Sequence, residues 1–159
     1  MNEIQFFSPN SVHDYEETAQ IFREYETYLG VDLCFQSFEE ELKNLSKVYE
    51  KPKGTIILAK VGAEIAGCIA LKPIELVNCE MKRLYVKPKF RGLRIGRKLV
   101  EMVIDFAKTK QYHKMKLDTL VQLKEAIHLY QSFGFKTTEA YVYNPLSEVL
   151  YFEKDLTNA

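Results

Sequence analysis

Tryptophan is absent from this chain of 159 residues, and cysteine, proline and glycine are scarce, with three, five and seven residues. Three cysteines cannot all pair, so the chain has no disulfide framework of the kind that holds small secreted domains together. Neither the cysteines nor the histidines show the spacing of metal ligands. We therefore expect no metal site, and free thiols in a reducing cytoplasm. The residues concerned are Cys34, Cys68, Cys79, His13, His113 and His128.

Long apolar runs are also missing. No segment approaches the roughly 20 apolar residues that span a bilayer, and Met1–Phe7 lacks the basic and apolar regions of a signal peptide. The formal net charge is zero, which argues against a nucleic-acid-binding protein. We expect a cytoplasmic protein with no membrane and no nucleic-acid partner. The length suits one domain, spanning residues 1–159.

The most distinctive stretch runs from Glu80 to Leu99 and predicts a strand, a short basic turn and the start of a long helix. Residues 82–98 contain eight Lys and Arg and no acid. Apolar residues at helical spacing from Ile95 onward predict that the helix begins close to Gly92. The first N–H groups of a helix lack intrahelical partners and carry the positive end of its dipole. Cations around them favour a phosphate or pyrophosphate ligand.

Two glycines define this turn. Gly92 and Gly96 have no Cβ, so a ligand can approach the backbone closely and the dihedrals can be strained. A Walker loop requires four residues between its glycines and Lys-Ser/Thr after them, and a dinucleotide fingerprint requires three glycines. Neither pattern fits this turn. A helix start with a solvated basic face is the alternative interpretation.

The segment Arg91-Gly-Leu-Arg-Ile-Gly96 resembles the phosphate turn of the GNAT superfamily of N-acetyltransferases. Arg91 and Gly96 match the first and last positions of the turn pattern, whereas Arg94 stands where the family has a glycine. Downstream, residues 126–135 match the family pattern Ala-x-x-Leu-Tyr-x-x-x-Gly-Phe at every position. The resemblance implies an α+β fold, with a mixed, mostly antiparallel sheet flanked by helices on both faces.

The patterning of the chain predicts the same order of elements. Alternation, capping residues and helical periodicity indicate seven strands and four helices. The expected strands are Ile4–Phe7, Thr55–Val61, Ile65–Leu71, Val77–Val86, Lys114–Asp118, Thr137–Tyr143 and Glu148–Glu153, and the expected helices run from Ser11 to Gly30, from Ser37 to Tyr49, from Gly92 past Ala107 and from Gln122 to Phe133.

The resemblance also implies the reaction. An acetyl group would pass from acetyl-CoA to a primary amine by direct attack, through a tetrahedral intermediate, without a metal. The coenzyme would lie between the strand ending at Val86 and the strand starting at Lys114. The backbone N–H of Leu84 would bind the oxyanion, and Leu123 stands where the family often has an Asn that contacts the coenzyme. The implied coenzyme-binding residues are Leu84, Tyr85, Val86, Arg91, Gly92, Leu93, Arg94, Ile95, Gly96, Arg97 and Lys98.

Two residues are the catalytic candidates. Glu80 stands at the family position of a glutamate that removes the proton from the amine, and Asp118 is the rival carboxylate. Regular strand alternation would put Glu80, Lys82 and Leu84 on one face of their strand. Tyr130 is the candidate acid for the departing thiolate. The structural alternatives are a strand carboxylate paired with a lysine and a core tyrosine.

The acceptor is the open question. In the family it is bound by segments that correspond to Gly30–Gln36 and Tyr143–Ser147, and neither carries a recognisable specificity pattern. Residues 1–50 hold eleven acids and three bases. This excess suggests a cationic small molecule or peptide amine, and solvated helix faces are the alternative interpretation. A non-catalytic acyl-CoA-binding protein is the alternative function, and a homodimer through the C-terminal strands is left open.

Overall fold

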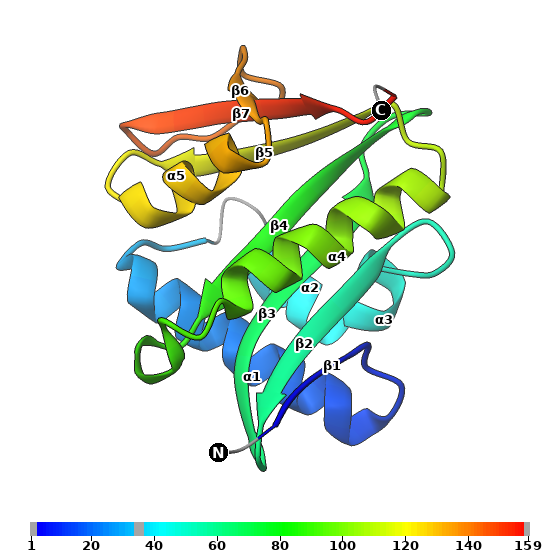
Figure 1. Cartoon of the computed structure of the whole chain (residues 1–159), viewed down its shortest axis with the longest axis vertical. Helices are drawn as coiled ribbons and strands as arrows, with labels where there is room; N and C mark the ends of the chain where they lie inside the picture. The colour runs from blue at the N-terminus through cyan, green and yellow to red at the C-terminus, as the bar shows by residue number, and fades with distance from the viewer. Residues whose placement is uncertain (1–2, 34–36, 158–159) are drawn as a thin grey trace.

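The computed structural model describes residues 3–33 and 37–157. Within these residues seven strands form one sheet in the order β1-β2-β3-β4-β5-β7-β6 (Figure 1). Neighbouring strands are antiparallel except β4 and β5, which are parallel. This is the mixed, mostly antiparallel sheet that the sequence predicted.

The elements follow one another in the expected order. The strands are β1 (Ile4–Phe7), β2 (Thr55–Val61), β3 (Glu64–Pro73), β4 (Asn78–Val86), β5 (Lys114–Leu120), β6 (Lys136–Thr137) and β7 (Val149–Asp155). The helices are α1 (Val12–Leu29), α2 (Phe38–Lys43), α3 (Leu45–Val48), α4 (Ile95–Thr109) and α5 (Lys124–Ser132), with a 3-10 turn, η2 (Pro88–Phe90), between β4 and α4.

Helices cover both faces of the sheet. Because successive strand residues point to opposite faces, the central strands are apolar on both sides: Ile57 of β2 packs toward α4, and Leu58 packs toward α1. The core on the side of Ile57 also contains Leu99 of α4 and Tyr130 of α5. The core on the side of Leu58 contains Phe22 of α1. Figure 1 shows α4 and α5 in front of the sheet and α1, α2 and α3 behind it. The α+β fold class is confirmed.

Three differences from the prediction are larger than the shifts of one or two residues at the other element ends. The second helix divides at Asn44, whose side-chain amide donates to the carbonyl of Glu40 at 3.0 Å and competes with the helix backbone. Helix α4 begins at Ile95 rather than near Gly92, because φ is +88° at Gly92 and +63° at Arg94, which a right-handed helix excludes. The strand expected over 137–143 shrinks to the two residues of β6.

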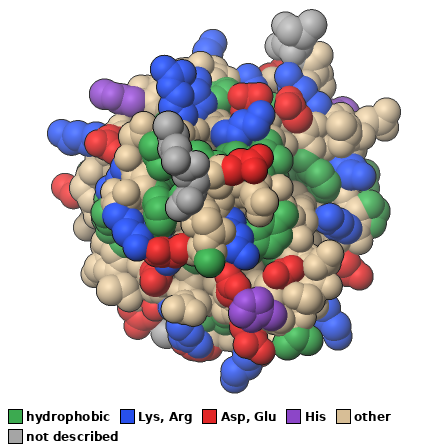
Figure 2. Space-filling view, turned by 60° about the horizontal axis from the view of Figure 1, so that its bottom comes forward, with side chains coloured by type: hydrophobic (Ala, Val, Ile, Leu, Met, Phe, Trp, Pro, Cys, Tyr) green, Lys and Arg blue, Asp and Glu red, His purple; other side chains and the backbone are tan. Residues whose placement is uncertain are grey.

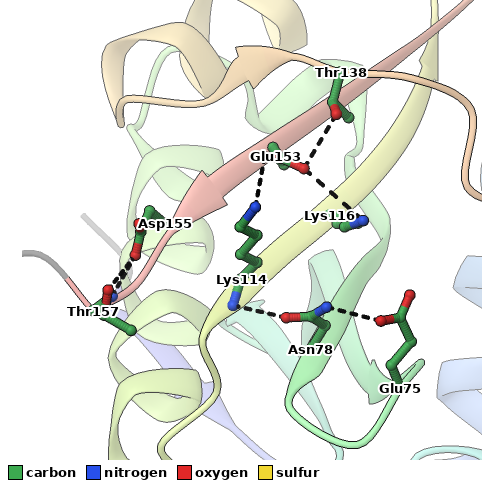
Figure 3. Close-up of polar contacts among 8 residues, drawn as sticks. All are labelled: Glu75, Asn78, Lys114, Lys116, Thr138, Glu153, Asp155 and Thr157. Atoms are coloured by element: carbon green, nitrogen blue, oxygen red, sulfur yellow. Dashed lines mark hydrogen bonds and ion pairs between the residues drawn. The ribbon is translucent and has the colours of Figure 1, made fainter.

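One end of the central strand pair is held together by side chains. Nδ2 of Asn78 donates to Oε2 of Glu75 at 3.1 Å, and Oδ1 of Asn78 accepts from the backbone N–H of Lys114 at 3.2 Å (Figure 3). On the other side of β5, Glu153 of β7 lies 3.3 Å from the ammonium of Lys114. Strands β4 and β5 are therefore joined at their beginnings, which determines where they can separate.

Candidate active site

Strands β4 and β5 separate after three paired residues. Their parallel register joins Asn78–Glu80 to Lys114–Lys116, and no further β4–β5 pair occurs in the described chain. Figure 1 shows the two strands diverging from that point toward the start of α4. The edge of β4 from Lys82 to Val86 therefore keeps backbone groups without a neighbouring strand on that side. Such an edge can pair with the extended chain of a ligand.

A bulge at Arg83 changes which side chains face each side of β4. The register with β3 shifts between Cys68 and Ala70, and φ of Arg83 is +62°. Arg83 consequently lies on the α1–α2 side with Tyr85, whereas Leu84 packs with Met81 on the α4 side. The predicted sharing of one face by Glu80, Lys82 and Leu84 is wrong, because an extra residue in a strand reverses its alternation.

A buried ion pair accompanies the bulge. The guanidinium of Arg83 makes two hydrogen bonds to the carboxylate of Glu41, at 2.6 and 3.1 Å, and the hydroxyl of Tyr49 donates to the same carboxylate at 2.8 Å. Arg83 also lies over the ring of Phe38. All the partners come from the α2–α3 segment, and they satisfy a charge that burial would otherwise make costly. This segment therefore holds the bulge in position.

A groove of about 500 Å³ runs from the start of α4 along the open edge of β4. Most of the predicted coenzyme-binding residues line it: Leu84, Tyr85, Val86, Arg91, Gly92, Arg94, Ile95 and Gly96. The first N–H groups of α4 have no side-chain cap in the described chain, and Arg94, the N-cap residue, is left-handed. Unpaired amides that follow directly on Arg91 and Arg94 can bind a phosphate or pyrophosphate.

Three predicted residues are not among the described residues that line the groove: Leu93, Arg97 and Lys98. Arg97 donates to Oγ of Ser132 at 3.1 Å and stacks on the ring of Phe133, so it joins α4 to α5. Lys98 pairs with Glu101 at 3.5 Å on the exposed face of the helix. The side chain of Arg97 thus points toward α5, and that of Lys98 points toward solvent. The basic composition of the segment did not indicate these directions.

Most of the eight cations between residues 82 and 98 already have acidic partners. The ammonium of Lys87 lies 3.5 Å from Glu24 and from Glu64, and that of Lys89 lies 2.7 Å from Glu64. Arg91 and Arg94 line the groove, and Arg91 is held over the ring of Tyr28 at 4.7 Å. On the face drawn in Figure 2, basic and acidic side chains are interspersed rather than gathered by sign.

A smaller cavity of about 50 Å³ adjoins the groove at the point where β4 and β5 separate. Both spaces are lined by Tyr25, Leu84 and Leu123. The cavity also receives Lys82 of β4, Asp118 of β5 and Tyr130 of α5, together with Leu33, Asn144 and Leu146 from the flanking segments. A proton donor, a carboxylate and an amine therefore meet at the inner end of the groove.

Tyr130 is a buried phenol with an unused hydroxyl. Its ring packs against Phe135 and Phe152, and its hydroxyl makes no hydrogen bond within residues 3–33 and 37–157. Burial raises the pKa of Tyr130 well above that of an exposed tyrosine, and the negative charge of Asp118 contributes. The hydroxyl therefore stays protonated at neutral pH and can donate into the cavity.

The two candidate carboxylates are held by one segment, residues 138–148, which contacts β4 at Glu80 and β5 at Asp118. The hydroxyl of Tyr141 donates to Oε2 of Glu80 at 2.8 Å, and Nδ2 of Asn144 donates to Oδ2 of Asp118 at 3.1 Å. Asp118 lines the cavity beside Tyr130, whereas Glu80 is not among the described lining residues. Burial and the charge of Glu80 raise the pKa of Tyr141, which keeps it a hydrogen-bond donor.

The described cysteines and histidines lie apart from this cavity. Cys68 and Cys79 are buried free thiols, and burial raises the pKa of Cys79 to about 12. Cys34 lies outside the described residues, as does part of the expected acceptor segment Gly30–Gln36. Within the described residues no group of His, Cys, Asp or Glu side chains could hold a metal ion. None of the helices in the described residues is long and apolar enough to cross a membrane.

Comparisons with known proteins agree with this geometry. Residues 15–135 match the profile described as the acetyltransferase (GNAT) family. An uncharacterised N-acetyltransferase of Schizosaccharomyces pombe is 40% identical over 146 residues, which cover 91% of this chain and 90% of the relative. The chain belongs to the GNAT family.

Solved structures of GNAT proteins share its fold. An acetyltransferase of the GNAT family from Staphylococcus aureus superimposes with a TM-score of 0.81 at 22% identity, covering 98% of this chain and all of the other. A Salmonella typhimurium protein, whose structure is described as containing acetyl-CoA, superimposes with a TM-score of 0.73 at 16% identity. It covers 99% of this chain and 96% of the other. At these identities the likeness is one of fold.

The sequence missed several residues of this GNAT site. Tyr25 and Tyr28 line the groove from α1, and nothing in the sequence of that helix marked them as site residues. Tyr141 and Asn144 lie in a segment predicted to be mostly strand and loop, with no pattern that marks them as partners of Glu80 and Asp118. The one feature of the sequence that could have indicated these two residues is their position in or beside the expected acceptor segment Tyr143–Ser147.

Proposed function

We propose that this GNAT protein, acting as one domain, transfers an acetyl group from acetyl-CoA to a primary amine of a small molecule or peptide. The observation that carries the proposal is the groove itself, because it leads from the unpaired amides of α4 to a cavity that contains Tyr130 and a carboxylate. The N-acetyltransferase name of the yeast relative and the acetyl-CoA in the Salmonella structure support the same activity.

The described residues fit coenzyme A along the whole groove. Arg91, Arg94 and the N–H groups at the start of α4 would hold the diphosphate. The open edge of β4, from Leu84 to Val86, would pair with the amide-containing arm. Leu123 adds an apolar contact on the opposite side, where the family often has a polar one. The acetyl thioester would then lie near the inner cavity.

The inner cavity supplies the groups that acyl transfer requires. A carboxylate, Glu80 or Asp118, accepts the proton of the ammonium, and the free amine attacks the thioester carbonyl carbon. The new C–N bond forms, the C–S bond breaks, and the thiolate takes the proton of Tyr130. The resulting phenolate then takes the second proton of the acylated nitrogen, which leaves a neutral amide. In this proposal the N–H of Leu84, next to the bulge, stabilises the oxyanion. Asp118 lines the cavity directly, whereas Glu80 lies behind Tyr141 and Lys82.

The first experiment measures binding and turnover separately. Calorimetry with acetyl-CoA tests the groove, and thiol release with a panel of amines, polyamines, aminoglycosides and peptides tests transfer. Tyr130→Phe should lower kcat by about 10²-fold with little change in the KM for acetyl-CoA, since it keeps the ring and removes the proton donor. Unchanged turnover in this variant would remove Tyr130 from the mechanism.

Tyr112→Phe is the matched control. Tyr112 is another buried tyrosine of the same core, 7% exposed, but its hydroxyl donates to the carbonyl of Lys53 at 2.7 Å, far from the groove. This variant should lose some stability and keep its kcat. Acetyl-CoA binding without thiol release for any amine would favour the alternative, a non-catalytic acyl-CoA-binding protein. Absence of binding by folded protein would end both interpretations.

A further inference from the structure

Lys82 places an amine of the chain itself at the inner cavity. It lines that cavity together with Asp118 and Tyr130, and its side chain is 11% exposed. Its Nζ lies 4.0 Å from Oε1 of Glu80. The proposed reaction requires an amine, a carboxylate and a proton donor in one enclosed space, and Lys82 completes this set without any added acceptor.

The register of the sheet explains why Lys82 lies there. Glu80 and Lys116 form the last parallel pair, so Lys82 and Asp118 each stand two residues beyond it on the same face. They therefore flank the point at which β4 and β5 separate. The bulge follows at Arg83 and does not alter the orientation of Lys82 relative to Glu80.

We propose that Lys82 is a site of self-acetylation. The proposal rests on the proposed function, because acetyl-CoA supplies the acetyl group. A neighbouring carboxylate accepts a proton from the Lys82 ammonium, and the neutral Nζ attacks the thioester carbonyl carbon. A C–N amide bond forms, the C–S bond breaks, and the leaving thiolate receives the proton of Tyr130. The Tyr130 phenolate then takes the second proton of Nζ, and the carboxylate releases the first proton to solvent. The net products are acetyl-lysine, coenzyme A and one proton.

The charges around Lys82 support this assignment. Burial lowers the pKa of Lys82, and so do the charges of Arg83 and Lys72, while the carboxylates of Glu80 and Glu41 act in the opposite direction. The net shift is downward, so a larger fraction of the amine is neutral and nucleophilic than on an exposed lysine. The product amide is stable, so acetylation would be a lasting modification that removes one positive charge from the cavity.

Lys116 is a matched internal control. It lies on the same face of the sheet, its side chain is 17% exposed, and its Nζ is 3.9 Å from Oε1 of Glu153 (Figure 3). Its burial and its carboxylate contact thus resemble those of Lys82. The difference that the comparison uses is that Lys116 is not among the described residues that line the cavity.

The experiment incubates the purified full chain with acetyl-CoA and no added amine, and follows the intact mass and the acetylated peptides over time. We expect the addition of one acetyl group, mapped to Lys82, with labelling at least about tenfold faster than at Lys116 because the reacting groups are held together. The first-order rate should not depend on protein concentration, as an intramolecular reaction requires. Lys82→Arg should abolish this label, Lys116→Arg should not, and Tyr130→Phe should slow it.

Two results would overturn the inference and leave the proposed function intact. One is rapid transfer to added amines with no label on Lys82. The other is a label spread over exposed lysines that neither Lys82→Arg nor Tyr130→Phe reduces, which indicates uncatalysed acetylation in solution. Failure of the folded protein to bind acetyl-CoA would instead remove the proposed function, and the self-acetylation with it.

Discussion

The outer end of the groove, at the start of α4, and the inner end, around Tyr130, are built from different parts of the chain. The outer end is largely one contiguous segment, residues 91–96, and it presents backbone N–H groups and two arginines. The inner end combines side chains of β4, β5, α5 and the 138–148 segment, which are far apart in the sequence.

The proposed function gives the two ends different tasks, which accounts for the difference. A diphosphate is recognised by amides that a single turn can present, and this site can remain open to solvent. Proton transfer requires groups within hydrogen-bond reach of one another in an enclosed space, which only the packing of several elements provides. Changes at the outer end should therefore alter the affinity for the coenzyme, and changes at the inner end should alter turnover.

The largest effect is expected from Glu41→Ala, which leaves the guanidinium of Arg83 buried without its partner. Loss of one member of a buried ion pair costs about 3–5 kcal/mol, so the free energy of unfolding in urea should fall by this amount. Since Glu41 acts on the bulge, the remaining folded protein should keep its affinity for coenzyme A and lose turnover. A parallel loss of affinity would contradict the separation of the two ends.

Glu39→Ala is the control for that measurement. Glu39 makes a similar pair of hydrogen bonds to Arg23, at 2.9 and 3.0 Å, but both side chains are 54% exposed. Solvent screens such a pair, so the free energy of unfolding should stay within experimental error. An equal loss in both variants would show that burial is not the cause.

The pH dependence of stability gives a second measure of the buried pair. Burial acts to raise the pKa of Glu41, but the hydrogen bonds and charge of Arg83 and the hydroxyl of Tyr49 outweigh it, and the pKa is lowered. The stabilisation is therefore complete above the unfolded-state pKa, about 4.3, and is lost as the pH falls through the lower folded-state value. Wild type should lose more stability than Glu41→Ala over this acidic range.

The next largest effect is a difference in kcat between variants of the two carboxylates, Asp118 and Glu80. Asp118→Asn should lower kcat by about 10²-fold, because Asp118 lines the cavity beside Tyr130. Glu80→Gln should cost about tenfold or less, because Glu80 is held by Tyr141 and reaches the cavity indirectly. Steady-state kinetics with a common amine compares the two variants, and the reverse order would assign the proton transfer to Glu80.

The smallest effect belongs to the outer end. Gly92→Ala places a Cβ on a residue with φ of +88°, where no heavy atom lies within 4 Å. Left-handed strain costs about 1 kcal/mol, and the altered turn should weaken coenzyme binding by about tenfold at most with kcat preserved. Calorimetry measures the affinity.

Gly30→Ala is the matched control for strain, since φ is +70° and no heavy atom lies within 4 Å of the added Cβ. Gly30 ends α1, away from the turn, so this variant should lose similar stability and bind the coenzyme normally. Equal weakening in both variants would mean that general instability, rather than the turn, reduces the affinity.

Local pattern was enough to predict most elements and the turn that lines the outer end of the groove. The Arg91–Gly96 turn and the apolar spacing of α4 involve neighbouring residues, so their geometry is encoded within a few positions. The match of residues 126–135 to the family pattern singled out Tyr130 for the same reason. Single-residue backbone features were harder to predict: the positive φ of Arg83 and Arg94 occurs at residue types that seldom adopt it.

By itself the sequence determined the family, the order of elements and the glycine-containing turn at residues 91–96, because these depend on short-range spacing. Only the tertiary structure decided which carboxylate lines the cavity, that Lys82 lies beside it, and that Tyr141 and Asn144 hold Glu80 and Asp118. The physical reason is that the cavity forms where β4 separates from β5, next to the bulge at Arg83 in β4. These depend on contacts between distant segments, such as Glu41 with Arg83, which no local pattern records.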